Sequence, residues 1–378
     1  DVRFKGFTDD WEQRKLRDIV GIYDGVHQTP KYQDGGIMFL SVENIATLHS
    51  SKYISEEDFK RDYKVYPQEN DILMTRIGDV GTTNVVTDNG LKAYYVSLAL
   101  LKYRSTNPFF LSNAIQSDYV QNGLANRTLK TAIPMKINKD EIGKVDVMLP
   151  TSTDEQVQIG TYFRNLDNLI TLHQRKCDNL KKIKKAMLEK MFPKNGNSVP
   201  DVRFKGFTDD WEQRKLRELV DVCNGRDYKH LKEGTIPVYG TGGYMLSVNE
   251  ALSYDKDAIG IGRKGTIDKP YILYAPFWTV DTLFYAIPAE KFDLNFAFDI
   301  FQNIDWKMKD ESTGVPSLSK TAINNIDIFI PKYYEQQFIG RLFSNLDNLI
   351  TLHQRKVENL KKIKKAMLEK MFPKEDLI

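Results

Sequence analysis

The 378-residue sequence is poor in cysteine and histidine and has no long apolar run. Its two cysteines, Cys177 and Cys223, are too few for a disulfide framework, which predicts a reducing compartment. No segment approaches the roughly 18 consecutive apolar residues of a membrane helix. No basic segment followed by an apolar one opens the sequence, as a secretory signal would. We therefore expect a cytoplasmic protein without a membrane partner.

Charge of neither sign dominates the chain. The sequence has 54 Lys and Arg against 51 Asp and Glu, a formal net charge of +3. This balance permits a polyanionic partner without requiring one, so local clustering of charge has to decide. The hydrophobic fraction of 41% and aromatic fraction of 11% are those of globular proteins. The length predicts about two or three domains.

Two blocks of sequence occur twice. Residues Asp1–Arg17 return unchanged at Asp201–Arg217. A second block starts at Asn165 and again at Asn345, and runs to Lys194 and Lys374. Its copies differ at only two positions, Cys177/Val357 and Asp178/Glu358. Near-identical frames around divergent inserts predict a pseudo-two-fold molecule with two different working surfaces.

The divergent regions between these blocks mix short strands with helices. Strand-like runs bounded by Gly or Pro are Gly36–Val42, Asp71–Ile77, Lys144–Leu149, Ala258–Ile261 and Ile326–Ile330. Helical patterns lie near Phe110–Asn122 and Phe296–Asn303. Both regions contain an Arg-x-Gly segment, at Arg76–Gly78 and Arg263–Gly265. We predict domains of mixed α+β and α/β class that share one scaffold and differ in surface.

A long helix follows each variable region. Ser152 and Glu155 have capping-box spacing, and Pro193 and Gly196 end the helical pattern near Phe192. Apolar positions then recur mostly at alternating steps of four and three, the period of a coiled coil. The first seam is Leu166, Ile170, His173, Cys177, Leu180, Ile183, Met187 and Met191. The second is Leu346, Ile350, His353, Val357, Leu360, Ile363, Met367 and Met371.

The predicted fold is two globular domains joined by two long helices packed as a coiled coil. Because the two halves run the same way about a two-fold axis, the helices should pair antiparallel. The expected parts are a first domain at 1–150, a helix at 151–194, a linker at 195–200, a second domain at 201–331, and a second helix with a C-terminal tail at 332–378.

Candidate catalytic and metal-binding patterns are weak. His173 and Cys177 are four residues apart on one helix, but the second copy has Val357 in place of the cysteine, which indicates a small buried apolar position. The glycines of 240–243 and 262–266 lack the spacing of nucleotide-binding loops and favour tight turns. Asn107–Phe110 lacks the second proline of the amino-methyltransferase signature. We predict no catalytic residue, cofactor or metal in this chain.

Basic residues beside loops and glycine turns, with interleaved aromatic residues, favour nucleic-acid recognition through phosphates and base edges. The candidates in the first variable region are Lys31, Tyr32, Arg76, Lys92, Arg127, Lys130, Lys136 and Lys139. Those in the second are Arg226, Lys229, Lys232, Tyr239, Arg263, Lys264 and Lys320. The lysine runs at 181–185 and 361–365 favour a solvated helix flank, and non-specific phosphate contact by them stays open.

Three motifs occur once in each half. The opener Trp11–Leu16 returns at Trp211–Leu216, and an apolar-Pro pair, followed by Glu-Gln after four residues in the first half and three in the second, precedes each helix. This pattern stands at Leu149–Gln156 and Ile330–Gln336, and it is followed by the segments Leu166–Lys176 and Leu346–Lys356. With this combination, essentially the whole chain resembles the specificity subunit of type I restriction–modification enzymes.

The resemblance implies that the variable regions are target-recognition domains, each reading one half of a bipartite, asymmetric site in double-stranded DNA. The helices would set the spacer between the half-sites. The repeated frame would dock two methyltransferase subunits, which carry S-adenosylmethionine. Motor–nuclease subunits, which use ATP and Mg, would join through the complex.

Two other classes of function stay open. A scaffold that binds only proteins, or a silent specificity copy, would have the same repeated frame. A self-contained DNA methyltransferase or nuclease would need a cofactor or metal site, and the sequence has no recognisable one.

Overall fold

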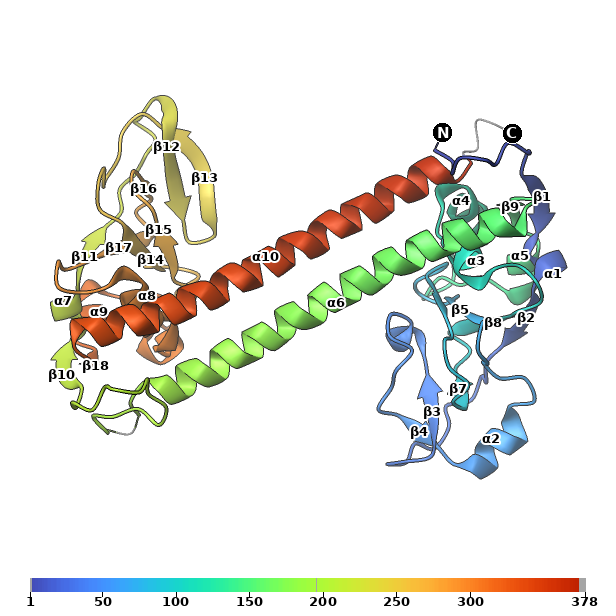
Figure 1. Ribbon diagram of the computed structural model, residues 1–378, viewed down its shortest axis with the longest axis horizontal. Helices are drawn as coiled ribbons and strands as arrows, with labels where there is room; N and C mark the ends of the chain where they lie inside the picture. Colours follow the sequence, from blue (N-terminus) through green and yellow to red (C-terminus); the bar gives the residue numbers. More distant parts are fainter. Residues whose placement is uncertain (1, 195, 374–378) are drawn as a thin grey trace. The chain divides into compact units, whose positions relative to one another are not determined.

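The structure, a computed structural model, describes residues 2–194 and 196–373. The chain forms two compact units, one of residues 1–173 with 355–378 and the other of residues 174–354. Two helices of 39 residues, α6 (Thr153–Met191) and α10 (Tyr333–Met371), each contribute one part to each unit (Figure 1). The predicted boundaries at residues 150, 194, 200 and 331 divide the sequence into modules, and they stay a prediction.

Three sheets form the first unit's domain. A four-stranded antiparallel sheet has the order β2-β8-β5-β6, and its strands are Gly21–Asp24 (β2), Ile72–Thr75 (β5), Thr83–Val85 (β6) and Leu98–Lys102 (β8). A three-stranded sheet, β4-β3-β7, consists of Ile37–Leu40 (β3), Tyr53–Ile54 (β4) and Lys92–Tyr94 (β7), with β3 parallel to β7. Strand β1 (Glu12–Lys15) pairs with β9 (Asp146–Leu149).

The four-stranded sheet lies between helices and the three-stranded sheet. Alternate residues of β5 enter different cores: Ile72 and Met74 pack towards the helices, whereas Leu73 packs towards the three-stranded sheet. Both faces of β5 are covered, which explains its uninterrupted apolar sequence. The helices are α1 (Leu16–Ile19), α2 (Glu56–Asp62), α3 (Pro108–Ile115), α4 (Asp118–Arg127) and α5 (Lys139–Gly143), with a short 3₁₀ turn η1 (Val42–Asn44).

The second unit has the same strand order. Its sheets are β11-β17-β14-β15, β13-β12-β16 and β10-β18, and β12 runs parallel to β16 as β3 does to β7. The strands are Glu212–Lys215 (β10), Val220–Asn224 (β11), Glu233–Gly240 (β12), Gly243–Val248 (β13), Ala258–Gly262 (β14), Tyr271–Leu273 (β15), Trp278–Thr279 (β16), Leu283–Pro288 (β17) and Asp327–Ile330 (β18). The helices are α7 (Leu216–Leu219), α8 (Leu294–Asn303), η2 (Trp306–Lys309) and α9 (Lys320–Asn324).

Most local predictions agree with these elements. All five predicted strands are present, as β3, β5, β9, β14 and β18. The glycines of 240–243 form the tight turn between β12 and β13, with Gly243 at a φ of +105°. The predicted helix at Phe110–Asn122 is instead two helices, because the Ser117 hydroxyl donates to the Ala114 carbonyl at 2.6 Å and its backbone turns extended.

The repeated opener is fastened to both helices in each unit. Arg3 donates to the buried Glu155 carboxylate at 2.6 and 2.7 Å, and Arg203 donates to Glu335 at 2.7 and 2.8 Å. Val2 N–H donates to the Lys370 carbonyl at 3.0 Å, just as Val202 N–H donates to Lys190. The opener arginine and the Glu of the Glu-Gln pair are therefore partners in an ion pair whose carboxylate is buried.

Helices α6 and α10 pair antiparallel within each unit, as predicted. In the first unit, Lys364 near the end of α10 donates to both oxygens of Asp167 near the start of α6, at 2.7 and 2.9 Å. In the second unit, Lys184 near the end of α6 donates to Asp347 near the start of α10, at 2.5 and 2.6 Å. Each lysine thus contacts the early part of the other helix.

Two predicted seam residues are wrong. Ile183 and Ile363 are 48% and 45% exposed, and the next residues, Lys184 and Lys364, take the inward positions. Strict alternation of steps of four and three, continued from Leu180, reaches Lys184. A lysine fits there because its aliphatic stem packs inward while its ammonium reaches an aspartate.

The other predicted seam residues face inward. The buried ones are Leu166, Cys177, Met191, Leu346, Ile350, Val357 and Met371, and the half-buried ones are Ile170, His173, Leu180, Met187, His353, Leu360 and Met367. Residue 195 of the predicted linker and residues 374–378 of the predicted tail lie outside the described residues. Among the described helices, none is long and apolar enough to cross a membrane.

Candidate nucleic-acid interface

In each unit, a loop that begins with a glycine follows the first strand of the four-stranded sheet. The loops begin at Gly25 after β2 and at Gly225 after β11, where a Cβ atom would collide with the carbonyl oxygens of Tyr94 and Val280. Only glycine fits there, so both loops leave the sheet at a tightly packed point. With the two glycines aligned, the tips differ at every position, Val26-His27-Gln28-Thr29-Pro30 against Arg226-Asp227-Tyr228-Lys229-His230.

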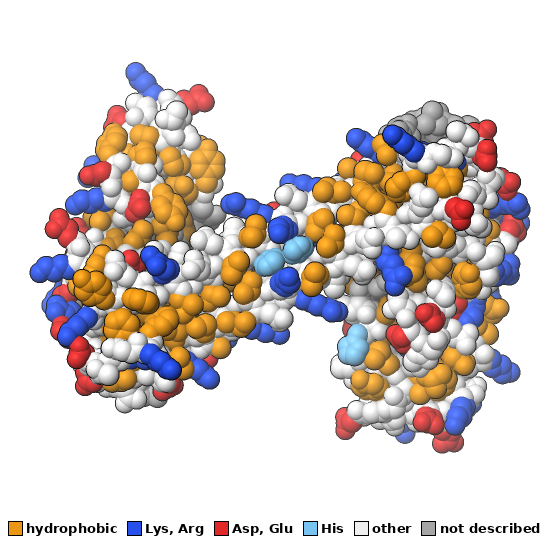
Figure 2. Space-filling model, in the orientation of Figure 1, with side chains coloured by type: hydrophobic (Ala, Val, Ile, Leu, Met, Phe, Trp, Pro, Cys, Tyr) orange, Lys and Arg blue, Asp and Glu red, His pale blue; other side chains and the backbone are white. Residues whose placement is uncertain are grey.

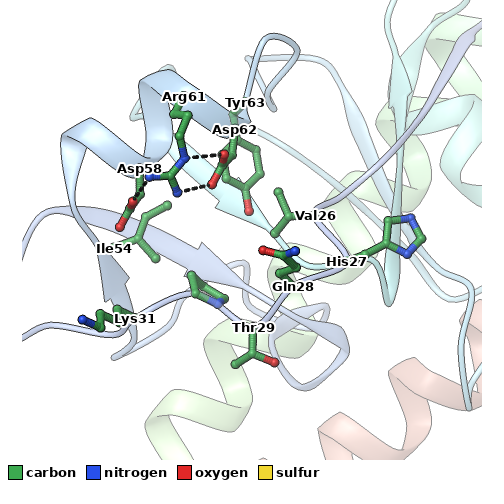
Figure 3. Close-up of a pocket in the computed structure, with 11 residues that line it drawn as sticks. Val26, His27, Gln28, Thr29, Lys31, Ile54, Asp58, Arg61, Asp62 and Tyr63 are labelled. Atoms are coloured by element: carbon green, nitrogen blue, oxygen red, sulfur yellow. Dashed lines mark hydrogen bonds and ion pairs between the residues drawn. The ribbon is translucent and has the colours of Figure 1, made fainter.

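The first of these loops borders a hollow in its domain. Figure 3 shows residues 26–31 facing Ile54 of β4 and the end of α2 across this hollow. The Arg61 guanidinium lies between two carboxylates, 2.7 Å from Asp58 and 2.7–2.8 Å from Asp62. Hydrogen bonds from Arg61 hold the pKa of the Asp62 carboxyl below its usual value. The hollow therefore combines two carboxylates that are paired with Arg61, the Gln28 amide and the exposed Lys31, a mixture of donors and acceptors that suits base edges.

The second loop borders a hollow with a different lining. Residues 228–234 and the β13 residues 244–248 line it, and Lys229 and Lys232 are exposed beside it. Tyr244 and Met245 are consecutive strand residues, yet both are exposed. Side chains of neighbouring strand residues point to opposite faces, so this end of the hairpin extends beyond the body of the domain. The second hollow thus combines lysine ammonium groups with an aromatic ring.

Most of the predicted DNA-contacting residues lie on the surface. The exposed ones are Lys31, Tyr32, Lys130, Lys136, Lys139, Arg226, Lys229, Lys232, Arg263, Lys264 and Lys320. Arg127 and Tyr239 are half-buried, with Tyr239 packed against Tyr244 and Tyr271. Lys320 lies 3.9 Å from the Asp221 carboxylate, an exposed pair that contributes little.

Arg76 and Lys92 do not belong to a DNA-contacting surface. Both side chains are buried. Arg76 pairs with Asp24 and donates through Nε to the Ile137 carbonyl at 3.1 Å, and burial lowers the pKa of its guanidinium. Lys92 pairs with Asp88 and donates to the Gly90 carbonyl at 3.0 Å. Their charges are neutralised inside the domain, so the prediction for these two residues is corrected.

Sequence reasoning missed the loop-tip residues that carry the richest hydrogen-bonding chemistry. These are His27, Gln28 and Thr29, although they follow Gly25 closely in the chain. The signal that could have found them is the alignment of the two halves on Gly25 and Gly225. Residues that follow a shared glycine and differ entirely between the two halves are candidates for contacts with different bases.

The two helices expose the same leucines. The early part of α6 in the first unit exposes Leu169 and Leu172, and the early part of α10 in the second unit exposes Leu349 and Leu352. Hydrophobic side chains reach the surface over the helices on the face drawn in Figure 2. Because these leucines lie in the repeated block, each unit carries one copy of the same apolar surface.

The described residues lack the cluster of ligands that a metal site requires. Within residues 2–194 and 196–373, no three His, Cys, Asp or Glu side chains lie close enough to hold a metal ion. Cys177 and its counterpart Val357 are both buried in the helix seam. The position behaves as a small apolar one in either copy.

Comparison with known proteins gives one consistent result. The family model described as type I restriction modification DNA specificity domain matches residues 8–182 and 208–362. The MjaVIII specificity subunit of Methanocaldococcus jannaschii is 23% identical over 95% of this chain and 91% of its own length. The putative MjaX specificity subunit of the same organism is also 23% identical, over 95% and 92%.

Solved structures give the same fold. The type I restriction–modification S subunit from M. genitalium has a TM-score of 0.73 and 16% identity, with 98% of each chain covered. A structure concerning complex assembly and conformational transition of the type I system has a TM-score of 0.51 and 12% identity, over 96% of this chain and 98% of that one. With both halves matched by the family model, the chain belongs to the type I restriction–modification DNA specificity family.

Proposed function

We propose that this chain is the DNA specificity subunit of a type I restriction–modification complex, in which each domain reads one half of a bipartite, asymmetric target. One observation carries the proposal. The same strand order and the same glycine-rooted loop occur in both units, while the loop tips differ. Two different readers on equivalent frames would recognise two different half-sites.

The residues would divide between phosphates and bases. The exposed lysines and arginines would position the duplex through its phosphates, a contribution that weakens with salt. The tips of the loops after Gly25 and Gly225 would contact base edges. The Gln28 amide suits a bidentate contact with adenine, and the Arg226 guanidinium suits guanine.

The partners would dock on the repeated frame. Two identical apolar surfaces, at Leu169 with Leu172 and at Leu349 with Leu352, would bind two copies of the same methyltransferase subunit. S-adenosylmethionine would belong to those partners, and ATP with Mg to motor–nuclease subunits. The chain itself would contribute no catalytic group, and its complex would act in the cytoplasm. The lengths of α6 and α10 would set the spacer between the half-sites.

Adenine-methylation mapping tests the proposal directly. DNA would be sequenced for methylated adenine from cells that express this chain with its cognate methyltransferase, with cells lacking only this chain as the control. We expect a single bipartite motif with a gap of unspecified bases, present only when the chain is expressed. A folded complex that methylates no motif would instead support the protein-only scaffold or the silent copy.

A further inference from the structure

A second pair of equivalent loops leaves each domain beside the Arg-x-Gly turn. In the first unit, residues 128–137 return to the turn through Ile137 N–H, which donates to the Arg76 carbonyl at 3.0 Å. Gly78 N–H donates in turn to the Met135 carbonyl at 2.8 Å. In the second unit, residues 309–318 make the matching bonds. Leu318 N–H donates to the Arg263 carbonyl at 2.9 Å, and Gly265 N–H donates to the Pro316 carbonyl at 2.8 Å. Both loops are therefore fastened at the base.

The tips of these loops are apolar and exposed. Ile133 is 100% exposed and is followed by Pro134 and the exposed Met135. In the second loop, Val315 is 54% exposed and precedes Pro316. A fully exposed isoleucine adds nothing to folding, because it removes no apolar surface from water. By the matching hydrogen bonds Gly314 is the residue equivalent to Ile133, and the exposed Val315 follows it, so both loops carry an exposed apolar residue near the tip, which indicates a surface built for a partner.

Charge around the first tip favours a polyanion as that partner. From Tyr119 to Lys139 the sequence contains no Asp or Glu, and it contains Arg127, Lys130, Lys136 and Lys139. Lys130 and Lys136 are exposed on either side of Ile133. The second loop has Asp310 and Glu311 against Lys309 and Lys320, so it has no such excess of positive charge. An apolar tip between exposed lysines matches the side chains that DNA-bending proteins insert between base pairs.

We propose that residues 128–137 form a DNA wedge. Ile133, Pro134 and Met135 would enter a groove and partly unstack one base step, while Lys130 and Lys136 contact the phosphates on either side. The loop at 309–318 would be the weaker counterpart, with Val315 and Pro316 at its tip. This inference rests on the proposed function, and it adds a mode of recognition in which DNA deformability contributes to specificity.

The test uses the complete complex with its methyltransferase and a duplex that carries the mapped target. 2-Aminopurine replaces one adenine at a time, since its fluorescence rises when a base unstacks. We expect wild type to raise fluorescence at one step. Ile133→Ser should abolish that rise and weaken binding about tenfold, as the burial of one isoleucine implies. The salt dependence of DNA binding by Ile133→Ser should match that of wild type.

Two further variants sharpen the result. Lys130→Gln with Lys136→Gln should reduce the slope of log affinity against log salt by about 0.9 for each phosphate that is no longer neutralised. Leu91→Ser changes an exposed apolar residue of the same domain outside both loops, and should behave as wild type. Circular dichroism of each variant confirms folding, which a fully exposed side chain should not affect.

The experiment distinguishes failure of the wedge proposal from failure of the proposed function. Unchanged fluorescence and affinity in Ile133→Ser, with wild-type binding intact, would overturn the wedge. Loss of assembly with the methyltransferase, instead of loss of DNA binding, would also overturn it and make the tip a protein contact. A wild-type complex that does not bind the mapped duplex would contradict the proposed function itself.

Discussion

At the scale of single residues, a buried aspartate distinguishes the second domain from the first. Asp299 lies six residues after the N-cap of α8, the place that Asn113 occupies after the N-cap of α3. Asp299 is buried, and its Oδ2 accepts no hydrogen bond from the described residues. Burial raises the pKa of its carboxyl well above the usual value, although Lys184 opposes the shift. An asparagine at this place carries no such charge.

Replacement of this aspartate by asparagine should stabilise the second unit at neutral pH. The folded pKa of Asp299 is raised, so stability is lost as pH rises above the unfolded pKa near 4 and through the folded value. Asp299→Asn removes that loss and should raise the free energy of unfolding by about 1–3 kcal/mol at pH 8. The gain should shrink towards pH 4.

Urea unfolding followed by tryptophan fluorescence measures this effect, because Trp211, Trp278 and Trp306 are buried in the second unit. Asp255→Asn, at an exposed carboxylate, is the matched control. An equal gain at pH 4 and pH 8 would refute the explanation by ionisation.

At the scale of elements, the packing of α6 against α10 is defined by its phase, that is, by which residues of each helix face the other. The inward positions follow one another at steps of four and three, and each helix carries an inward lysine paired with an aspartate of the other helix. Such a charged pair within an apolar seam restricts how the helices can align, as polar seam residues do in coiled coils. Ile183 and Ile363 lie one residue out of this phase and are exposed.

A charge introduced at two positions of α10 tests that phase. Val357→Asp places a carboxylate at a buried seam position and should cost about 3 kcal/mol or more of stability. Ile363→Asp makes a comparable change at an exposed position and should stay within about 0.5 kcal/mol of wild type. Thermal unfolding of both variants would show the difference. Similar losses would mean that the assigned phase is wrong.

The exposed leucines of the helices should each govern one docked partner. Leu172→Arg places a charge on the apolar surface of the first unit and leaves Leu352 of the second unit intact. We expect the complex with the methyltransferase to change from two partner copies to one, measured as mass by light scattering after gel filtration. Thr171→Arg adds the same charge beside the leucines and should retain both copies. Two copies on Leu172→Arg would exclude this surface as the dock.

At the scale of the whole molecule, the two units share the repeated sequence blocks and differ in the loops of their variable regions. The opener, the Glu-Gln pair that follows each proline and the helix ends make the same contacts in both units. The variable regions keep their strand order while their loops diverge. A target assembled from two independent readers could change one half at a time, while the frame proposed to bind the partners stays constant.

Lengthening both helices should move the half-sites apart. Seven residues of coiled-coil sequence, inserted after Arg175 and after the equivalent Arg355, preserve the alternation of four and three. They lengthen each helix by roughly 10 Å, which corresponds to about three base pairs. Methylation mapping should then show the same two half-sites with a longer gap. An unchanged gap would contradict the role of the helices in spacing.

Local predictions succeeded where neighbours in sequence decide the structure. The glycine turn at 240–243 and the five strands follow from residues a few positions apart, whereas the Glu155 carboxylate of the predicted capping box binds the distant Arg3 instead. The prediction that failed in the seam came from reading Ile183 as inward because it is apolar. The continuous phase of the helix, set by residues on both sides, makes Lys184 the inward residue instead.

The sequence by itself determined the internal repeat, the two long helices and the antiparallel pairing, because periodicity and identity are properties of the chain alone. Only the tertiary structure decided which charged residues are free to meet a partner. Arg76 and Lys92 are basic residues like Lys130, yet they are buried beside Asp24 and Asp88. Burial depends on what distant segments bring into contact, as when Ile137 returns to Arg76, and no local pattern records that.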